Sequence, residues 1–344
     1  STLSMLNSGQ QAIIATALVA MLWRATQGVA DGHMTLGDLV MVNAFMIQLY
    51  IPLNFFGVIY REIKQNLTDL DKMFTLMDRP QEVADAPGAQ PLHIAPGSSP
   101  AVRFEDVHFA YEPNRPILRG VSFEIPAGKT VAVVGPSGAG KSTLARLLFR
   151  FYDIQQGRIS LAGQDMQSVT QASVRSCVGI VPQDTVLFND TVAYNIAYGR
   201  PGATPQEVEQ AARAAHIHGF IASTPKGYDT MVGERGVTLS GGQKQRVSIA
   251  RAFAKQPDVV LLDDCLSAVD TNTESQILGY LENALADKTA IIITHRIYSM
   301  LQFDKIIVLD NHQITEEGTH EELLAQGGYY AELFEKQSAG EFEG

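Results

Sequence analysis

A glycine-rich turn is the part of the sequence most able to do chemistry. Residues 130–143 read TVAVVGPSGAGKST, in which an apolar run precedes Gly135, Gly140, Lys141 and Ser142. Glycines let the backbone curl tightly, so that amide N–H groups and the start of a helix face an anion. Lys141 would reach the β and γ phosphates of a nucleotide, and Ser142 would coordinate Mg²⁺. We therefore predict a phosphate-binding loop rather than an ordinary glycine turn, formed by Gly135, Pro136, Ser137, Gly138, Ala139, Gly140, Lys141, Ser142 and Thr143.

An aspartate at the end of an apolar run supplies a second element of the same chemistry. The sequence VVLLD, residues 259–263, suits a buried strand that ends in a carboxylate at Asp263. If that strand lies beside the phosphate-binding loop, Asp263 stands near the Mg²⁺. An aspartate at a strand end more often caps a helix or a turn, but the loop earlier in the chain favours the metal-binding interpretation.

A second candidate anion-binding turn lies at residues 239–246, LSGGQKQR. It supplies a serine and two glycines at an expected helix start, where backbone N–H groups attract negative charge. Because the chain already has one phosphate-binding loop, a second one suggests that phosphate is bound from two sides. Taken alone, a serine followed by two glycines is also a common start of any helix. The predicted contacts are Ser240, Gly241, Gly242 and Gln243.

Composition limits the kind of protein. The chain has 344 residues, 45% of them apolar, which is enough for two domains with cores of their own. Its formal net charge of −11 argues against general nucleic-acid binding through a basic surface. The two cysteines, Cys177 and Cys265, lack metal-ligand spacing, which fits a reducing compartment. We expect Cys265 to pack beneath the aspartates rather than to react.

Two uncharged stretches near the N-terminus predict a membrane hairpin. No charged residue occurs in residues 1–23 or 39–60. Each stretch exceeds the ~20 residues that a helix needs to cross a bilayer, although a pair of buried helices in a soluble bundle is the alternative. Because the sequence starts inside an apolar pattern without a basic n-region, we expect further membrane helices upstream rather than a signal peptide.

The rest of the chain divides into a helix extension, a linker and a soluble domain. Residues 61–80 keep helical spacing while becoming charged, and Pro80 should end that helix in the cytosol. Residues 80–100 are rich in Pro, Gly, Ala and Ser, which indicates a linker. Strand-like runs then alternate with helical stretches, the pattern of a parallel sheet covered on both faces. We therefore predict a partial membrane domain over 1–79 and an α/β domain over 101–344.

Together these segments resemble the nucleotide-binding domain of ABC transporters, and the resemblance covers residues 102–336. The family's motifs are matched in order by Tyr111, the Walker A loop at 135–143, Gln183 in VPQD, Glu234 in VGERG, the signature at 239–243, Asp263, the D-loop SAVD at 267–270 and His295 in ITHR. The resemblance implies an α/β P-loop NTPase with a parallel sheet core, an antiparallel β edge and a helical subdomain, preceded by an all-α transmembrane helical hairpin. That order is the order of an exporter-type half-transporter.

The resemblance also implies residue roles, with ATP and Mg²⁺ as ligands. Tyr111 would stack on adenine, Gln183 would touch the Mg²⁺ or the attacking water, and His295 would hydrogen-bond the γ-phosphate. Two such domains would sandwich two ATP molecules, with the Walker A loop of one facing the signature of the other and Asp270 at the dimer contact. The implied metal ligands are Ser142, Gln183 and Asp263, and the implied catalytic residues are Asp264, His295 and Gln183.

The sequence up to residue 230 looks most like the ATM type of exporter, which is mitochondrial or proteobacterial. The resemblance rests on LNSGQQAI, GDLVMVNAFMIQLYIPLNFFGVIYR, ARLLFRFYD and GIVPQDTVLFNDTVAYNIAYGRP. Such exporters handle glutathione-linked or iron–sulfur-related cargo in an inner membrane, with the nucleotide-binding domain on the cytosolic or matrix side. The positions implied for the cargo pocket are Asn7, Gln10, Asn54, Gly57 and Arg61.

A polar residue that faces a membrane cavity is a functional candidate. Helix–helix hydrogen bonding explains the Asn and Gln residues of this set nearly as well. Arg61 would equally suit the cytosolic interface of the membrane.

Asp264 departs from the family pattern. Members that hydrolyse ATP efficiently carry glutamate there, and the shorter aspartate holds its carboxylate farther from the water. A general base must lie within about 3 Å of its target, and a misplacement of about 1 Å can cost about 100-fold, so we expect slow turnover at this chain's own ATP site. The signature is intact, and this combination resembles one subunit of a heterodimeric exporter.

The two resemblances conflict. ATM-type exporters are usually homodimers with glutamate at position 264, whereas the sequence from VGERGVTLSGGQ onward looks more like a heterodimer subunit. A composite sequence would also explain the change.

The leading prediction is an ATP-hydrolysing exporter subunit. Its partners would be a second half-transporter, identical or different, membrane lipid and a small-molecule cargo, but no nucleic acid. One alternative is a multidrug or lipid exporter subunit of a heterodimer. The other is a regulatory ATP-binding module with little turnover, which only Asp264 supports and which His295 and Gln183 argue against.

Overall fold

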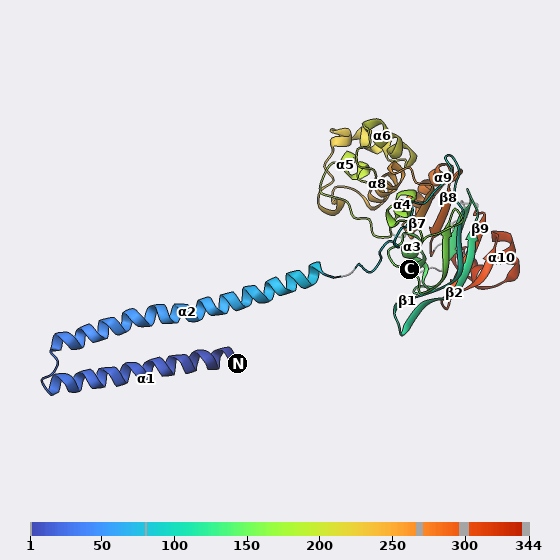
Figure 1. Cartoon of the computed structure of the whole chain (residues 1–344). Helices are drawn as coiled ribbons and strands as arrows, with labels where there is room; N and C mark the ends of the chain where they lie inside the picture. Colours follow the sequence, from blue (N-terminus) through green and yellow to red (C-terminus); the bar gives the residue numbers. More distant parts are fainter. Residues whose placement is uncertain (1, 80, 266–270, 296–302, 339–344) are drawn as a thin grey trace. The chain divides into compact units, whose positions relative to one another are not determined.

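The computed structural model describes residues 2–79, 81–265, 271–295 and 303–338. The chain forms two compact units, Ser1–Gln81 and Glu82–Gly344. The first is a pair of long helices, and the second combines two sheets with a set of shorter helices (Figure 1).

The first unit is a helical hairpin. α1 (Thr2–Ala30) and α2 (Leu36–Met77) run in opposite directions and are joined by a short turn. The Thr35 hydroxyl accepts from the Asp38 N–H (3.3 Å), and the Asp38 carboxylate accepts from the Thr35 N–H (2.8 Å). Because this reciprocal pair satisfies two N–H groups that a helix start leaves without partners, the turn sequence itself determines where α2 begins.

The first helix fits the predicted membrane span. Gln11–Ala30 is long and apolar enough to cross a membrane, and it is the one such stretch among the described residues. Leu36–Leu49 of α2 is a shorter apolar helix. The span predicted over 39–60 includes residues 50–54, whose side chains lie outside the described part, so it stays a prediction. Large apolar side chains such as Trp23 are exposed along both helices and need lipid or other helices to cover them.

A mixed sheet forms the centre of the second unit. In the described part of the chain this sheet has six strands in the order β10-β9-β3-β8-β7-β6. The strands are β3 (Thr130–Val134), β6 (Val178–Val181), β7 (Val259–Asp263), β8 (Thr289–Ile293), β9 (Lys305–Asp310) and β10 (Gln313–Gly318). All pair in parallel except β10, which is antiparallel to β9. β3, β7 and β8 are almost wholly buried, which explains their continuous runs of apolar residues.

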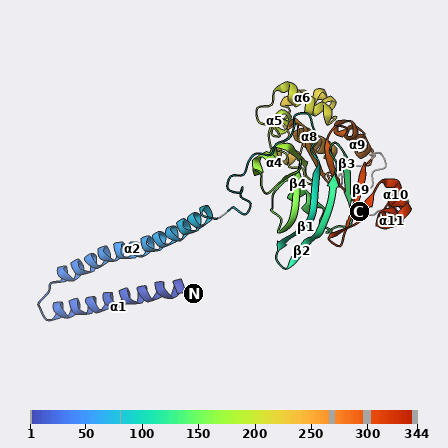
Figure 2. The same ribbon diagram turned by 45° about the vertical axis from the view of Figure 1, so that its right-hand side comes forward.

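A four-stranded antiparallel sheet completes the strand structure (Figure 2). Its order is β2-β1-β4-β5, and its strands are β1 (Val102–Glu112), β2 (Arg115–Ile125), β4 (Gln156–Leu161) and β5 (Gln164–Asp165). Burial alternates along β1 because one face packs on the core while the other meets solvent. The parallel core and the antiparallel edge predicted from the sequence are both confirmed.

The predicted helical subdomain occupies the chain between β6 and β7, where its helices cluster together (Figure 1). It contains α5 (Val192–Ala197), α6 (Pro205–Ala214), α7 (His218–Ser223), the 3-10 turns Gly227–Asp229 and Glu234–Gly236, and α8 (Gly241–Ala254). One buried apolar cluster joins these helices to β6 and β7. The other helices of the unit are α3 (Lys141–Leu148), α4 (Gln171–Cys177), α9 (Thr271–Leu285), α10 (His320–Gln326) and α11 (Tyr329–Ser338).

The segment predicted as a linker is part of the second unit. The sequence predicted a linker over residues 80–100, but residues 82–100, which we call the connector, belong to the ATPase-like unit. The Leu92 N–H donates to Ser173 Oγ (2.8 Å), and the Thr289 hydroxyl donates to the Pro100 carbonyl (2.7 Å). Pro and Gly keep the connector irregular, so its backbone groups find partners elsewhere, and composition alone does not report such distant partners.

The rings of Phe104 and Phe123 stack inside the core of this unit, with centroids 4.5 Å apart and an interplanar angle of 11°. Because Phe104 is 1% exposed, Phe104→Ala should leave a cavity and lower the free energy of unfolding by about 3–5 kcal/mol. Chemical denaturation followed by far-ultraviolet circular dichroism measures this loss. Val237→Ala, at a side chain 75% exposed, is the control and should change the value by less than about 0.5 kcal/mol. Equal effects of the two substitutions would contradict a tightly packed core here.

Candidate nucleotide-binding site

The loop after β3 can be built only with glycine at two positions. Gly135 has φ 149°, and a Cβ there would lie 2.0 Å from the Leu309 carbonyl oxygen of β9. Gly140 has φ 111°, and its Cβ would lie 3.0 Å from the Ile117 carbonyl oxygen. Since any side chain would collide with backbone, these glycines let the loop pass close to its neighbours and leave its inner side to an anion.

Lys141, the first residue of α3, places its amine inside this loop. It is 5% exposed, and its Nζ donates to the carbonyls of Gly135 (2.7 Å) and Pro136 (2.9 Å). Burial lowers the pKa of Lys141 to about 8, although the carboxylates of Asp264 and Asp263 act in the opposite direction. The loop therefore holds a cation that little solvent screens.

Ser142 and Asp263 bring two oxygen ligands together. The Ser142 hydroxyl donates to Asp263 Oδ1 at 3.0 Å. Burial raises the pKa of Asp263, the bond from Ser142 lowers it, and the neighbouring Asp264 raises it further. A hydroxyl and a carboxylate side by side are hard oxygen donors of the kind that Mg²⁺ prefers, so the residues fit the predicted metal.

The three residues predicted to be catalytic lie around the same loop. Gln183 Nε2 is 3.4 Å from Asp264 Oδ2, and His295 Nδ1 is 3.4 Å from Lys141 Nζ. Asp264 is 6% exposed, and its N–H donates to the Ile293 carbonyl at the end of β8 (2.8 Å). Burial lowers the pKa of His295, and the charge of Lys141 lowers it further. The imidazole is therefore neutral at neutral pH.

Tyr111 is held at the same site by a residue that the sequence did not single out. Its hydroxyl lies 3.3 Å from Thr143 Oγ1, and Arg146 NH1 donates to it at 3.1 Å. Arg146 lies one helical turn after Ser142 on α3. This spacing is visible in the sequence and could have marked Arg146 as a neighbour of the site. Tyr111 is 41% exposed, and its role in stacking on adenine stays a prediction.

The signature residues start α8. Ser240 Oγ accepts from the Gln243 N–H (3.3 Å), and Gln243 Oε1 accepts from the Ser240 N–H (2.9 Å), while Gly241 and Gly242 form the first turn. Within the described residues, no hydrogen bond or ion pair joins 239–243 to the loop at 135–143. The signature residues and the phosphate loop of this chain are therefore two separate groups of residues. The predicted dimer contact Asp270 lies outside the described residues.

A buried glutamine links the region after Gln183 to the signature helix. The Thr185 hydroxyl donates to Gln245 Oε1 on α8 at 2.8 Å. The sequence did not reveal this contact, because no local pattern distinguishes a buried Gln245 from an exposed one. Cys265 is buried nearby, and burial raises the pKa of its thiol to about 12, which agrees with the expectation that it packs rather than reacts.

The residues predicted for a cargo pocket lie on the two long helices. Asn7 and Gln10 belong to α1, and Asn54, Gly57 and Arg61 belong to α2. Apart from Arg61, the side chains of this set lie outside the described part, and the role in binding cargo stays a prediction.

Comparison with known proteins agrees with this geometry. Residues 118–267 match the family model described as ABC transporter. The glycine loop after a central parallel strand, the strand-ending Asp263 and the capped signature helix are the arrangement expected of the ATPase domain of an ABC transporter, and residues 118–267 match the model of that family.

Within the family, the chain is similar to exporters of the ATM type. It is 49% identical over 340 residues to the mitochondrial iron-sulfur clusters transporter ABCB7 of Homo sapiens, covering 98% of this chain and 45% of that protein. It is 50% identical over 340 residues to the ATM1-type heavy metal exporter of Novosphingobium aromaticivorans, covering 98% and 55%. The solved structure of a bacterial Atm1-family ABC exporter with ATP bound matches with a TM-score of 0.78 and 50% identity, covering 97% of this chain and 59% of that one. The chain thus spans about half the length of the curated relatives it matches.

The lowered pKa of Lys141 makes nucleotide affinity depend on pH. Bound phosphate needs the charged amine, whereas the free chain loses that charge as the pH rises through about 8. We expect ATP affinity to fall above that pH, by up to about tenfold per pH unit, with uptake of a proton on binding. Isothermal titration calorimetry in buffers of different ionisation enthalpy measures both quantities.

Lys141→Arg is the matched control for this prediction. Its guanidinium stays charged throughout, so its weaker affinity should not change over the same pH range. If the ATP affinity of both proteins falls with pH at the same slope, titration of Lys141 is not the cause.

Proposed function

We propose that the chain is the ATP-binding and ATP-hydrolysing part of an ABC exporter, together with two helices of its membrane domain. The observation that carries the proposal is the bond from Ser142 to Asp263 (3.0 Å) beside the buried amine of Lys141. A hydroxyl, a carboxylate and an ammonium group at one glycine loop are what a nucleoside triphosphate and its metal require. Similarity to exporters over 98% of the chain supports the transport part of the proposal.

In the proposed reaction, water attacks the γ-phosphorus of ATP and the bond to the β–γ bridging oxygen breaks, which yields ADP and phosphate. Asp264 accepts a proton from the water, and the amide of Gln183 helps to orient that carboxylate. Lys141 and the neutral His295 stabilise the charge that develops on the transferred phosphoryl group. Ser142, Asp263 and Gln183 would hold Mg²⁺, which when bound would supply neutralisation of phosphate charge.

A second copy, or a related half-transporter, completes the site in this proposal. The signature residues cap their own helix and make no described bond to the loop of the same chain, which leaves them available to a partner's nucleotide. Asp270 is proposed at the contact between the two chains. Asp264, where efficient members of the family carry glutamate, favours a heterodimer whose partner supplies the faster site.

For the cargo we propose a small molecule of the glutathione-linked or iron–sulfur-related class. Two observations support this class: the names of the relatives, an iron-sulfur clusters transporter and a heavy metal exporter, and the polar positions on the two long helices. The pocket would include Asn7, Gln10, Asn54, Gly57 and Arg61. The chain would lie in a bacterial or mitochondrial inner membrane, with the ATPase unit on the cytosolic or matrix side.

Replacement of Asp264 tests the proposed chemistry. Asp264→Glu lengthens the side chain by one methylene group and should bring the carboxylate to the water. We expect kcat for ATP hydrolysis by the full chain to rise by about tenfold or more, which corresponds to about 1.4 kcal/mol. The assay is phosphate release at protein concentrations high enough for two chains to associate.

A control variant and the rate of the wild type distinguish the proposed function from its alternatives. Asp264→Asn is the matched control, because it keeps the size of the side chain and removes the base, so it should lower kcat below that of the wild type. A wild type that is already as fast as Asp264→Glu would show that aspartate suffices, and it would remove the argument for a heterodimer. A chain that binds ATP but hydrolyses none in any variant would favour the regulatory module.

A further inference from the structure

Arg150 is a buried charge that the nucleotide chemistry does not use. It lies two residues after the end of α3 and is 2% exposed. Its NH1 donates to the Val169 carbonyl (2.6 Å), and its Nε donates to Asp153 Oδ1 (3.1 Å). Its backbone has φ 51°, which residues other than glycine rarely adopt. A buried guanidinium is tolerated only where its donors are paired, so the remaining partners of Arg150 show what it holds.

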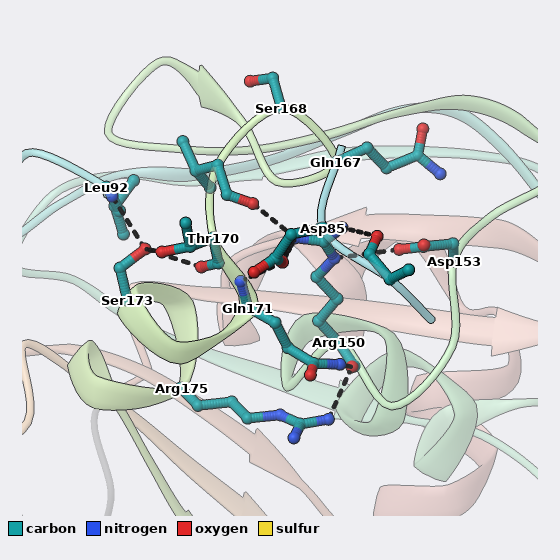
Figure 3. Close-up of polar contacts among 12 residues, drawn as sticks. Asp85, Leu92, Arg150, Asp153, Gln167, Ser168, Thr170, Gln171, Ser173 and Arg175 are labelled. Atoms are coloured by element: carbon teal, nitrogen blue, oxygen red, sulfur yellow. Dashed lines mark hydrogen bonds and ion pairs between the residues drawn. The ribbon is translucent and has the colours of Figure 1, made fainter. Parts of the chain in front are cut away.

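The remaining partners lie on the connector (Figure 3). Arg150 NH1 is 3.5 Å from Asp85 Oδ1, and NH2 donates to the Ala84 carbonyl (3.4 Å). The same oxygen of Asp85 accepts from the N–H of Gln171, the first residue of α4, at 2.7 Å. Thr170, which precedes α4, makes no side-chain cap of its own. The connector therefore supplies the carboxylate that caps α4.

Further hydrogen bonds join the same three segments. The Arg150 carbonyl accepts from Gln171 Nε2 and from Arg175 NH2, each at 3.0 Å. The Thr170 N–H donates to the Gln90 carbonyl of the connector (3.0 Å). We call the cluster of Asp85, Arg150, Asp153, Gln171 and Arg175 the latch.

The latch is connected along the chain to two parts of the nucleotide site, through α3 on one side and through α4 and β6 on the other. α3 begins with Lys141 and Ser142 and ends immediately before the residues that lead to Arg150. α4 runs directly into β6, and the chain after β6 reaches Gln183. On the other side, the connector begins five residues after Met77, the last residue of α2. Packed secondary structure transmits displacement because it moves as a unit.

We propose that Asp85 and Arg150 are positioning residues that fasten the connector to α3 and α4, so that the state of the nucleotide site is transmitted to the connector. This inference rests on the proposed function, since ATP is the signal that is transmitted. ATP binding at the start of α3 tightens α3, and through the latch it tightens α4 and residues 84–93. Without the Asp85 carboxylate, the nucleotide site keeps its ligands but the connector no longer responds.

Amide hydrogen exchange measured by mass spectrometry on the full chain, with and without Mg²⁺ and ATP, tests this transmission. In the wild type, ATP should slow exchange of residues 84–93 by about threefold or more. In Asp85→Ala, exchange of residues 171–177 without nucleotide should rise by about fivefold, because the cap of α4 is lost. The response of residues 84–93 to ATP should then disappear, while the Kd for ATP changes less than about twofold.

Three further variants make the comparison specific. Asp85→Asn keeps the oxygen that accepts from Gln171 and should restore wild-type exchange of α4 and most of the response. Glu82→Ala removes an exposed carboxylate from the same connector and should behave as wild type. The Asp85 side chain is 41% exposed, so its loss should leave the unit folded. Ser173→Ala removes the acceptor of the Leu92 N–H (2.8 Å) and should weaken the response independently.

An ATP response of residues 84–93 that is equal in Asp85→Ala and wild type overturns the proposal. So does a wild-type connector that does not respond when calorimetry shows ATP binding to be saturated. A chain that binds no ATP contradicts the proposed function instead. The nucleotide-free exchange of residues 171–177 in Asp85→Ala against Asp85→Asn then still decides whether Asp85 holds α4.

Discussion

The buried amine of Lys141 is the interaction on which the nucleotide site depends. Taking an ammonium group out of water is costly, and here the carbonyls of Gly135 and Pro136 at 2.7 and 2.9 Å offset part of that cost. Those carbonyls can face the amine only because the loop turns back against the Leu309 carbonyl of β9, where a Cβ would lie 2.0 Å away. The glycines of the loop and the packing of β3 on β9 therefore depend on each other.

The order of the parallel strands then decides which groups surround that amine. β8 lies between β3 and β7, so the carboxyl ends of three strands open on the same edge of the sheet. Asp263 ends β7, His295 follows β8, and the phosphate loop follows β3. Burial at this edge is the main cause of the pKa shifts of Lys141, Asp263 and His295, and the neighbouring charges modify them.

Two sets of contacts lead away from the nucleotide site. One passes from Thr185 to Gln245 and into the helix that carries the signature. The other passes through α3 and α4 to Arg150 and the connector. The first leads toward the surface proposed to face a partner chain, and the second leads to the connector, which follows α2 in the sequence. A nucleotide that orders the loop can thus affect both, because short packed elements carry displacement between them.

Local patterns were sufficient for much of this protein. The glycine loop, the strand-ending Asp263, the capped start of α8 and the apolar hairpin are visible in the sequence, because their spacing reflects backbone geometry that few residue types permit. The parallel core follows from continuous apolar runs between helices. The order of the motifs carries the resemblance to the family and marks Gln183 and His295 as candidate site residues.

Only the tertiary structure decided which distant groups meet. Arg146 holds Tyr111, Gln245 holds Thr185, and Asp85 caps a helix more than eighty residues further along the chain. The connector shows the difference most directly, since its composition predicted a linker, whereas its backbone hydrogen-bonds to distant residues of the second unit. Residue types and short spacings determine local conformation, whereas partners for buried polar groups depend on long-range packing, which a reading of local sequence does not contain.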